Sequence, residues 1–295
     1  MAEWEQKDHA ETYLIFPENI GAFLSFDEVA LTQGELYTVV TNKAAQGKKG
    51  ALVAMIQGTK ASAIAAVLLK IPFERRSLVT EVTLDMADSM DAAIRAVFPN
   101  AVRVTDRFHV QQLVSEAVQE IRITLRRAAI QEENEARKCS RAEEQPYLPP
   151  VFENGDTKKQ LLARSRYLLF KPKNTWNEQQ NERAGILFKE YPKMEEAYNL
   201  AMMFRHGYEQ SESQEEAKEY FAQWYEKVRE KGWEEFLTAA ESIQWHEETI
   251  LNYFTHRSTN AGAESFNAKL KNFRAIVRGV RDKKFHLFRV AKLYG

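Results

Sequence analysis

The segment VTEVTLDMADSMDAAIRAVFPNAVRVTDRFHV, residues 79–110, decides which fold this sequence can adopt. Its apolar run at 79–84 predicts a buried strand, residues 89–97 predict a short helix with Ser89 at the N-cap, and residues 101–105 predict a second strand. An acid follows each strand directly, Asp85 after the first and Asp106 after the second. The segment therefore predicts a strand–helix–strand unit with a carboxylate at the end of each strand.

The residues before this segment predict three further strands, at 20–27, 35–42 and 51–57, separated by Gly34 and by the loop around 47–50. Residues 62–69 predict a helix, and a long helix begins after 105, with apolar residues at helical spacing from Val110 to Leu125. Three antiparallel strands followed by helix, strand, helix, strand and helix is the order of the RNase H-like fold. We therefore expect an α/β protein with an RNase H-like mixed five-stranded sheet and flanking helices, although other α/β folds share parts of this order.

The remainder of the chain is predicted to be largely helical. Residues 139–156 are polar and contain three prolines, which indicates a loop. Helices are predicted at 161–170, 177–190, 193–204, 214–231 and 233–254. Trp176, Trp224, Trp233 and Trp245 lie here, and this spacing favours a helical-bundle core over a DNA-stacking surface. We expect an RNase H-like core at 1–138, a mostly helical insertion at 139–256, and a C-terminal helix at 257–295 that completes the core.

Composition excludes several classes of protein. The chain of 295 residues is 44% hydrophobic and 28% charged, as expected of a soluble globular protein with a sizeable core. No apolar run approaches the roughly 20 residues that span a bilayer, and residues 1–10 lack the apolar core of a signal peptide. The single cysteine, Cys139, excludes an internal disulfide and a cysteine-rich zinc finger. A cytoplasmic protein without membrane contact is the simplest expectation.

The net charge of −1 hides a strong local asymmetry. Residues 257–295 contain ten lysines and arginines and two acids, whereas residues 209–248 are acidic. Local basic patches govern phosphate binding more than the overall charge does, so the C-terminal stretch is a candidate nucleic-acid surface. The alternative is an ordinary solvated helix face.

Acids attached to the predicted strands and to the C-terminal helix indicate a metal-dependent site. Asp27 follows the apolar run 20–26, and Glu264 lies at the head of the basic helix. Carboxylates from neighbouring strand ends plus one from a helix can hold two Mg²⁺ ions against a phosphodiester, which indicates a nuclease or a transposase. Glu28 competes with Asp27, because one of two consecutive strand residues must face away from the site. Taken singly, each acid could instead be an ordinary turn residue.

The helix that contains Glu264 has two distinct faces at 100° per residue. Its apolar face consists of Phe266, Leu270, Phe273 and Val277. Its polar face consists of Asn260, Glu264, Asn267, Lys271, Arg274 and Arg278. An acid flanked by amides and then by cations suits a metal-binding helix that runs along a DNA backbone. An ordinary amphipathic surface helix would have the same periodicity.

Three motifs make the sequence resemble the DDE transposases of bacterial insertion sequences. They are FDE at 26–28, TDRFHV at 105–110 and STNAGAESFN at 258–267. Within that family the chain is similar to the group with an Asp-x-x-His motif and an all-helical insertion before the final glutamate, as in Mutator-like and hAT elements. The resemblance extends over nearly the whole chain.

The resemblance implies a catalytic and metal-binding triad of Asp27, Asp85 and Glu264, and the family pattern favours Asp27 over Glu28. The implied cofactor is a pair of Mg²⁺ ions, for which Mn²⁺ would substitute. In the resembled family, Asp106 and His109 adjoin the triad and support it structurally or by contacting the DNA. The polar face of the helix adds Asn260 and Asn267 as supporting residues and Lys271, Arg274 and Arg278 as phosphate contacts. His109 could equally be a satisfied buried histidine.

The activity implied by the resemblance is cleavage of DNA at the ends of an insertion sequence and strand transfer into target DNA. The implied partner is double-stranded DNA, both terminal repeats and target, and pairing two DNA ends indicates a homodimer or a higher oligomer on DNA. Because few residues precede the first predicted strand, we expect a separate polypeptide, as in elements with split reading frames, to recognise the terminal repeats. The alternatives are an RNase H-like structure-specific nuclease without strand transfer and an inactive, domesticated DNA-binding protein.

Overall fold

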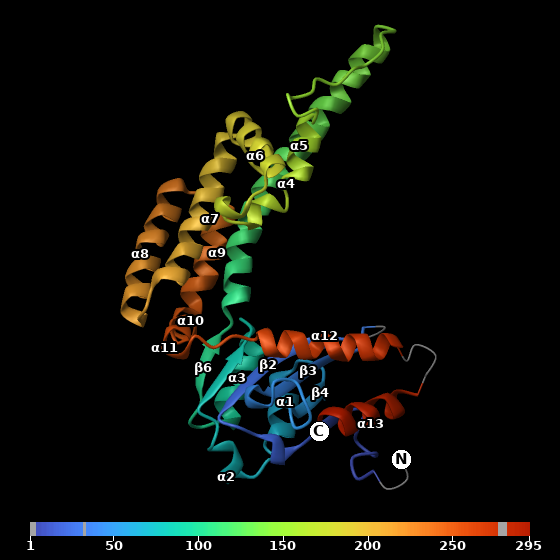
Figure 1. Ribbon diagram of the computed structural model, residues 1–295, viewed down its shortest axis with the longest axis vertical. Helices are drawn as coiled ribbons and strands as arrows, with labels where there is room; N and C mark the ends of the chain where they lie inside the picture. The colour runs from blue at the N-terminus through green and yellow to red at the C-terminus, as the bar shows by residue number, and fades with distance from the viewer. Residues whose placement is uncertain (1–3, 32–33, 277–281) are drawn as a thin grey trace. The chain divides into compact units, whose positions relative to one another are not determined.

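The computed structural model describes residues 4–31, 34–276 and 282–295 (Figure 1). The chain forms two compact units, one of residues 1–110 with 246–295 and one of residues 111–245. Among the described residues, no helix is both long and apolar enough to cross a membrane.

The first unit is built on a six-stranded mixed sheet. Its strands are β1 (Tyr13–Ile15), β2 (Phe23–Ala30), β3 (Leu36–Asn42), β4 (Leu52–Gln57), β5 (Glu81–Leu84) and β6 (Val102–Thr105), in the order β1-β4-β3-β2-β5-β6. β2, β3 and β4 are antiparallel neighbours, whereas β5 and β6 run parallel to β2. This is the RNase H-like arrangement with one additional edge strand.

The expectation of five strands was therefore one strand short. β1 pairs antiparallel with β4, with Tyr13 opposite Ile56 and Ile15 opposite Ala54. A strand of three residues is too short for the alternation of buried and exposed side chains to identify it from sequence. Its burial pattern, with only the central Leu14 fully buried, arises because it closes the edge of the sheet.

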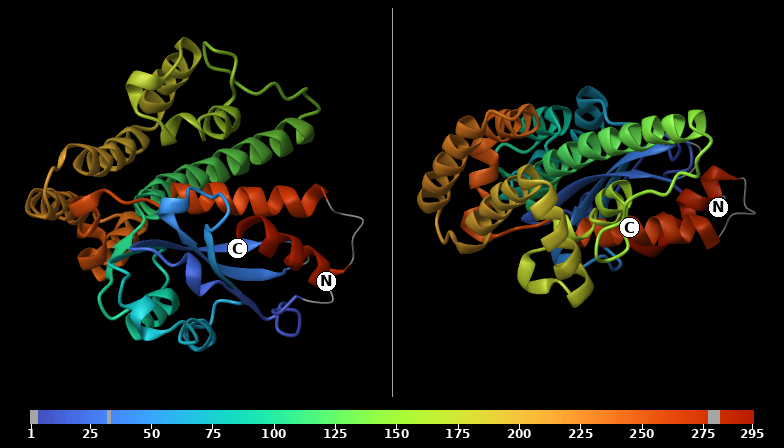
Figure 2. Two further views of the ribbon diagram at one scale, coloured as in Figure 1. Left: turned by 60° about the horizontal axis from the view of Figure 1, so that its bottom comes forward. Right: turned by 90° about the horizontal axis from the view of Figure 1, so that it is seen from above.

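Helices cover both faces of the sheet (Figures 1 and 2). One face packs against α1 (Ala61–Leu68) and α3 (Asp88–Val97), in a core that includes Phe26, Val40 and Val82. The other face packs against α12 (Ala261–Ile276) and α13 (Lys283–Tyr294), in a core that includes Val29, Val39 and Phe266. Phe26 and Val29 belong to opposite cores because consecutive strand side chains alternate between the two faces. Short helical turns complete the unit: η1 (Pro17–Asn19), η2 (Lys43–Ala45), α2 (Phe73–Arg76), α10 (Glu247–Leu251) and α11 (Tyr253–His256).

The C-terminal stretch 257–295, expected as one helix, contains two helices in its described parts, 257–276 and 282–295. α12 ends at Ile276, and α13 begins after Asp282, whose side chain accepts a hydrogen bond from the backbone N–H of Phe285 as an N-cap. The sequence signal for this second start is the Asp282 cap followed by apolar residues. Arg278, expected to contact DNA, lies outside the described residues, as does Val277.

The second unit is all-helical. It contains α4 (Arg107–Ala142) from Gln111 onward, α5 (Lys158–Arg164), α6 (Glu178–Glu190), α7 (Pro192–Gln210), α8 (Gln214–Lys231) and α9 (Glu234–Trp245), with 3₁₀ turns η3 (Leu168–Phe170) and η4 (Lys173–Thr175). The long helix expected at 233–254 is interrupted after Trp245 and again after Leu251. The helix expected at 161–170 ends at Arg164. The hydroxyl of the next residue, Ser165, donates a hydrogen bond to the carbonyl of Leu161.

The tryptophans of this unit differ in burial. Trp176 and Trp224 are buried, and their indole N–H groups donate to the carbonyls of Leu168 and Leu200, both at 2.9 Å. Trp233 is half-buried between the ammonium groups of two lysines, and Trp245 is 79% exposed. Trp176 and Trp224 therefore belong to the core of the helical unit, as expected, whereas Trp245 does not.

Candidate active site

Three aspartates lie at the same level of three adjacent strands. The parallel register pairs Ser25 with Thr83, and Thr83 with Val104. Two residues further along the chain lie Asp27, within β2, and Asp85 and Asp106, which directly follow the last residues of β5 and β6. Because positions two apart on a strand share a face and strands are about 4.8 Å apart, these carboxylates lie side by side along one edge of the sheet.

The face of the sheet that carries Asp27 is the one covered by α12. Asp27 pairs across the ladder with Val39, which belongs to the core on that face. The side-chain N–H of Asn267, on α12, donates to Asp27 Oδ2 at 2.7 Å, and Asp27 Oδ1 accepts from the backbone N–H of Glu28 at 2.8 Å. By strand alternation Glu28 belongs to the opposite face. This geometry places Asp27, and not Glu28, beside the helix that contains Glu264.

The N-terminus of α12 is fixed to the sheet by Asn260. Its backbone N–H donates to Asp106 Oδ1 at 3.2 Å, and its side-chain N–H donates to the carbonyl of Phe26 at 3.0 Å. Asn260 and Asp106 are each 1% exposed. These two bonds connect residues from β2, from the end of β6 and from the start of α12. They determine where Glu264, one turn further along the helix, is positioned.

A compact set of potential ligands lies at this junction. Among the described residues, Asp106, His109 and Glu264 each offer a ligand atom, and these three atoms lie within 4.8 Å of one another. His109 Nδ1 is also 3.7 Å from Asp85 Oδ1. The structure thus brings together all five of the acidic and imidazole side chains named from the sequence. Asp106 and His109, expected as supporting residues, are part of the tightest group.

Electrostatics within the cluster disfavour several simultaneous negative charges. Burial raises the pKa of Asp27 above its usual value, and the neighbouring Asp85 adds to the rise. Burial likewise raises the pKa of Asp106. The pKa of Glu264 is raised by burial and by repulsion from Asp106 and Asp27. A multivalent cation would relieve this repulsion, because it favours the ionised form of every acid around it.

A second, independent observation supports a divalent metal at the cluster. Asp106 Oδ2 is buried and has no hydrogen-bond partner among the described residues. A buried carboxylate oxygen without a partner is costly, and oxygen ligands of this kind suit Mg²⁺ or Mn²⁺. Asp27 and Asp85 each accept a backbone hydrogen bond on Oδ1, which leaves further lone pairs on both carboxylates.

Sequence reasoning overlooked a buried ionic network beneath this site. Glu81 is 2% exposed; its Oε1 lies 3.6 Å from the ammonium group of Lys43, and its Oε2 lies 2.8 Å from His256 Nδ1. Lys43 also donates to the hydroxyl of Thr83. The signal in the sequence was the acid Glu81 inside an apolar strand, because a charged residue in a buried strand requires a partner.

The expected DNA-binding cations of α12 differ in their surroundings. Lys271 is exposed, as is Glu264, which lies seven residues earlier on the same helix. Arg274 is half-buried and interacts electrostatically with Tyr37 and His286. Asn267, expected on the same polar face, is 4% exposed because it turns toward Asp27. The polar face predicted from periodicity is therefore divided between solvent and the sheet.

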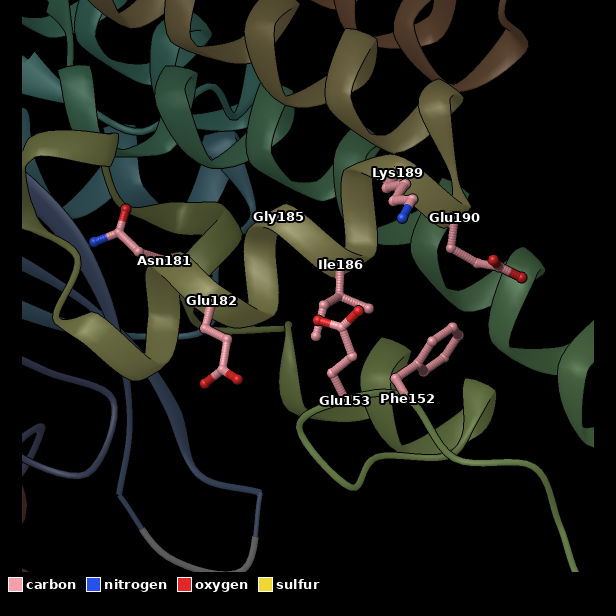
Figure 3. A pocket seen from close by; sticks show the side chains of 8 residues that line it. All are labelled: Phe152, Glu153, Asn181, Glu182, Gly185, Ile186, Lys189 and Glu190. Carbon is pink, nitrogen blue, oxygen red and sulfur yellow. The ribbon is translucent and has the colours of Figure 1, made fainter.

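A pocket of about 400 Å³ lies wholly within the helical unit (Figure 3). Phe152 and Glu153 line it from the loop before α5, opposite residues of α6 that include Glu182 and Ile186. None of the site residues named from the sequence lines this pocket. This pocket is therefore separate from the acidic cluster.

The fold and the cluster together define a protein of RNase H-like architecture with carboxylates gathered at its strand ends, and comparison with known proteins gives the family. Residues 24–290 match a family described as transposase, the DDE transposases of the ISL3 type, so the chain belongs to that family. It is similar to the transposases for insertion sequence element IS1557 of two Mycobacterium tuberculosis strains, CDC 1551 / Oshkosh and ATCC 25618 / H37Rv. Each is 25% identical over 265 residues, or 88% of this chain. The chain spans 57% of the length of these relatives.

Proposed function

We propose that this transposase cuts phosphodiesters at the ends of an insertion sequence and joins the freed ends to target DNA, with catalysis at Asp27, Asp85 and Glu264. The observation that carries the proposal is the alignment of Asp27, Asp85 and Asp106 on adjacent strands, with Glu264 brought to them by α12. Carboxylates so arranged from distant parts of a chain are needed for a metal-dependent phosphoryl-transfer site, and a structural role does not require them.

The proposed chemistry consists of two displacements at phosphorus. In the first, a water oxygen attacks the phosphorus, the bond to the 3′-oxygen breaks, and that oxygen leaves as a 3′-hydroxyl. In the second, the same 3′-oxygen attacks a phosphodiester of the target, and the target's own 3′-oxygen leaves. Each step exchanges one phosphorus–oxygen bond for another, so no oxidant or energy source is needed.

Two Mg²⁺ ions, or Mn²⁺ in their place, would supply charge stabilisation for the attacking and leaving oxygens when bound at the cluster. Asp27, Asp85 and Glu264 are the proposed ligands, and Asp106 and His109 are near enough to contribute. Asn267 orients the carboxylate of Asp27, and Asn260 holds Asp106 through its backbone N–H. Such supporting bonds fix ligand orientation before the substrate arrives.

The proposed substrate is double-stranded DNA, bound through its phosphates by Lys271, Arg274 and Arg278. Pairing of two element ends would require at least two copies of the chain. Catalysis is assigned to the RNase H-like core, 1–138 with 257–295, which the mostly helical insertion at 139–256 interrupts. Recognition of the terminal repeats would come from outside the matched region, either from sequence joined to this chain or from a separate polypeptide. The proposed compartment is the cytoplasm, where bacterial DNA lies.

The test uses purified protein with duplexes that carry the element's terminal repeats, in Mg²⁺ or Mn²⁺, and resolves nicked and joined products on a sequencing gel. Asp27→Asn, Asp85→Asn and Glu264→Gln should each reduce cleavage by at least about 100-fold, as expected for removal of a principal catalytic group. Asp88→Asn is the matched control, because Asp88 is 81% exposed and three residues from Asp85. Nicking without joining would favour the nuclease, and binding without either would favour the inactive protein.

A further inference from the structure

An exposed phenylalanine stands at the edge of the acidic cluster. Phe108 is 58% exposed and lies in the first turn of α4, two residues after Asp106. Its ring meets the ring of His109 edge-on, with centroids 5.6 Å apart and planes at 82°. His109 Nδ1 in turn lies 3.7 Å from Asp85 Oδ1. One side chain therefore separates the phenyl ring from the carboxylates of the site.

Phe108 does not lie on the buried face of α4. The buried stripe of α4 passes through Val110, Val114 and Ala117. At 100° per residue, Phe108 lies roughly 150° from the centre of that stripe. Its neighbours on the same side of the helix, Gln112 and Ser115, are polar. From the amphipathic pattern of the helix we expect a polar residue at position 108, but the residue there is a phenylalanine.

A flat apolar ring exposed beside a phosphodiester site has a natural partner in the substrate. The face of a nucleobase stacks on aromatic side chains whatever the base, and apolar side chains inserted at a base step unstack it. A base pair that stays stacked holds the neighbouring phosphate within the regular duplex backbone. A ring that receives one base would let the strand bend so that the neighbouring phosphate reaches the carboxylates at the strand ends.

We propose that Phe108 is a stacking residue for the nucleobase next to the scissile phosphate, after that base has left the duplex. The inference rests on the proposed function, because the position of the base is defined relative to the phosphate that the acidic cluster cuts. The ligand class is any unpaired DNA base, since the ring offers no hydrogen bond that would select one.

The experiment compares Phe108→Ala and Phe108→Trp with Phe73→Ala. Phe73, on α2 of the same unit, is also 58% exposed and is therefore a control matched in residue type and exposure. The substrates are two terminal-repeat duplexes, one fully paired and one mismatched at the base pair next to the cleavage position. Thermal unfolding of each variant checks that the fold is retained.

Phe108→Ala should cut the paired duplex about 10- to 100-fold more slowly than the unaltered protein, which corresponds to the loss of one base–aromatic stack. It should cut the mismatched duplex at the unaltered rate, because the base is already free. Phe108→Trp and Phe73→Ala should cut both duplexes normally. The proposal is overturned if Phe108→Ala cuts the paired duplex at full rate, or if it is slowed equally on both, which would indicate an effect through His109.

A second readout separates this proposal from the proposed function. If the unaltered protein cuts neither duplex, 2-aminopurine placed next to the cleavage position reports unstacking on binding in Ca²⁺. A rise in its fluorescence with the unaltered protein and with Phe73→Ala, but not with Phe108→Ala, supports the stacking site even though the cleavage proposal has failed. Equal signals from all three proteins overturn it.

Discussion

The side-chain amide of Asn267 donates to Asp27 Oδ2 at 2.7 Å, although 240 residues separate the two in the chain. Asn267 also donates to the carbonyl of Glu28 at 3.4 Å, so a single side-chain amide on α12 holds two residues of β2. The insertion of a helical unit between the two halves of the sheet-containing unit has therefore not loosened their contact. Polar contacts at the surface of α12 that faces the sheet, and not only apolar packing, set the helix position.

Asn267→Asp should reduce cleavage by about 10- to 100-fold, the range seen when a group that orients a metal ligand is lost. The change removes the donor to Asp27 and places a second carboxylate against it, while the side-chain volume stays the same. Steady-state cleavage in Mn²⁺ measures the effect. Asn272→Asp, at an exposed position of the same helix, is the control and should cut normally. Normal activity of Asn267→Asp would show that Asp27 needs no orienting bond.

Divalent cations should stabilise the folded protein, and Asp106→Asn should reduce that effect. At Mn²⁺ near 100 times its dissociation constant, the free energy of unfolding should rise by about 2.7 kcal/mol in the unaltered protein. Because burial raises the pKa of Asp106 in the folded state, its ionised form destabilises the fold at pH above the usual carboxyl range. Without metal at pH 7, Asp106→Asn should therefore be the more stable protein. Calorimetry with and without chelator decides the matter, and a variant that still gains the full Mn²⁺ stabilisation would exclude Asp106 as a ligand.

Much of this arrangement could be predicted from the sequence, for an identifiable physical reason. Strand ends marked by acids, such as Leu84-Asp85 and Thr105-Asp106, are local signals, because an apolar run that stops at a charged residue indicates where a buried strand leaves the core. The order of such strands then limits the topology to a few possibilities. The RNase H-like architecture and the gathering of the acids follow from these two facts.

The features that sequence could not provide depend on contacts between distant residues. The pairing of Glu81 with Lys43 and His256 requires knowing that β5, η2 and α11 are neighbours. The amphipathic pattern of α12 likewise could not distinguish Asn267, which turns inward to Asp27, from Lys271, which remains exposed. A helical period defines a face, but the partner of that face is decided by tertiary packing.

Replacing Lys271, Arg274 and Arg278 together with alanine should weaken binding to DNA of any sequence. Each lost phosphate contact lowers the magnitude of the slope of log K against log salt by about 0.9. The slope of the triple variant should therefore be smaller in magnitude by about 2 to 3. The slope is measured by fluorescence anisotropy on two unrelated duplexes, over roughly 50 to 200 mM salt. Lys218→Ala, exposed on α8, is the control for charge. A slope unchanged by the triple substitution would assign this helix to another partner.

His286 should make the fold sensitive to acid. It is 2% exposed, stacks on Phe273, and its pKa is lowered to about 4 by burial and by the nearby Arg274 and Arg289. A depressed pKa means that the unfolded chain binds the proton more readily between the usual value of 6.5 and about 4, so stability falls as the pH falls through that window. The loss should be about 3 kcal/mol. Urea unfolding of His286→Phe, which keeps the stacked ring, should show that much less acid dependence than the unaltered protein; parallel pH curves would refute the assignment.

Glu81→Ala should be among the most destabilising single substitutions in the sheet-containing unit. The carboxylate of Glu81 is 2% exposed and lies 3.6 Å from the ammonium group of Lys43, whose pKa is lowered by burial. Removal of Glu81 leaves Lys43, whose side chain is 21% exposed, without its nearest carboxylate, which costs about 3 kcal/mol, the lower end of the range for a broken buried pair. His256, the other partner, is more than half exposed and contributes less. Because His256 lies four residues before Asn260, cleavage should fall together with stability.

The double variant Lys43→Met with Glu81→Met decides whether the buried charge is the cause. An apolar pair of similar volume carries no desolvation penalty, so it should recover most of the stability that Glu81→Ala loses. The coupling free energy from the complete cycle, measured by urea unfolding, should exceed about 1 kcal/mol, as expected for residues in direct contact. If the two single substitutions simply add, Lys43 and Glu81 do not act as a pair, and the cost of losing Glu81 lies in its bond to His256.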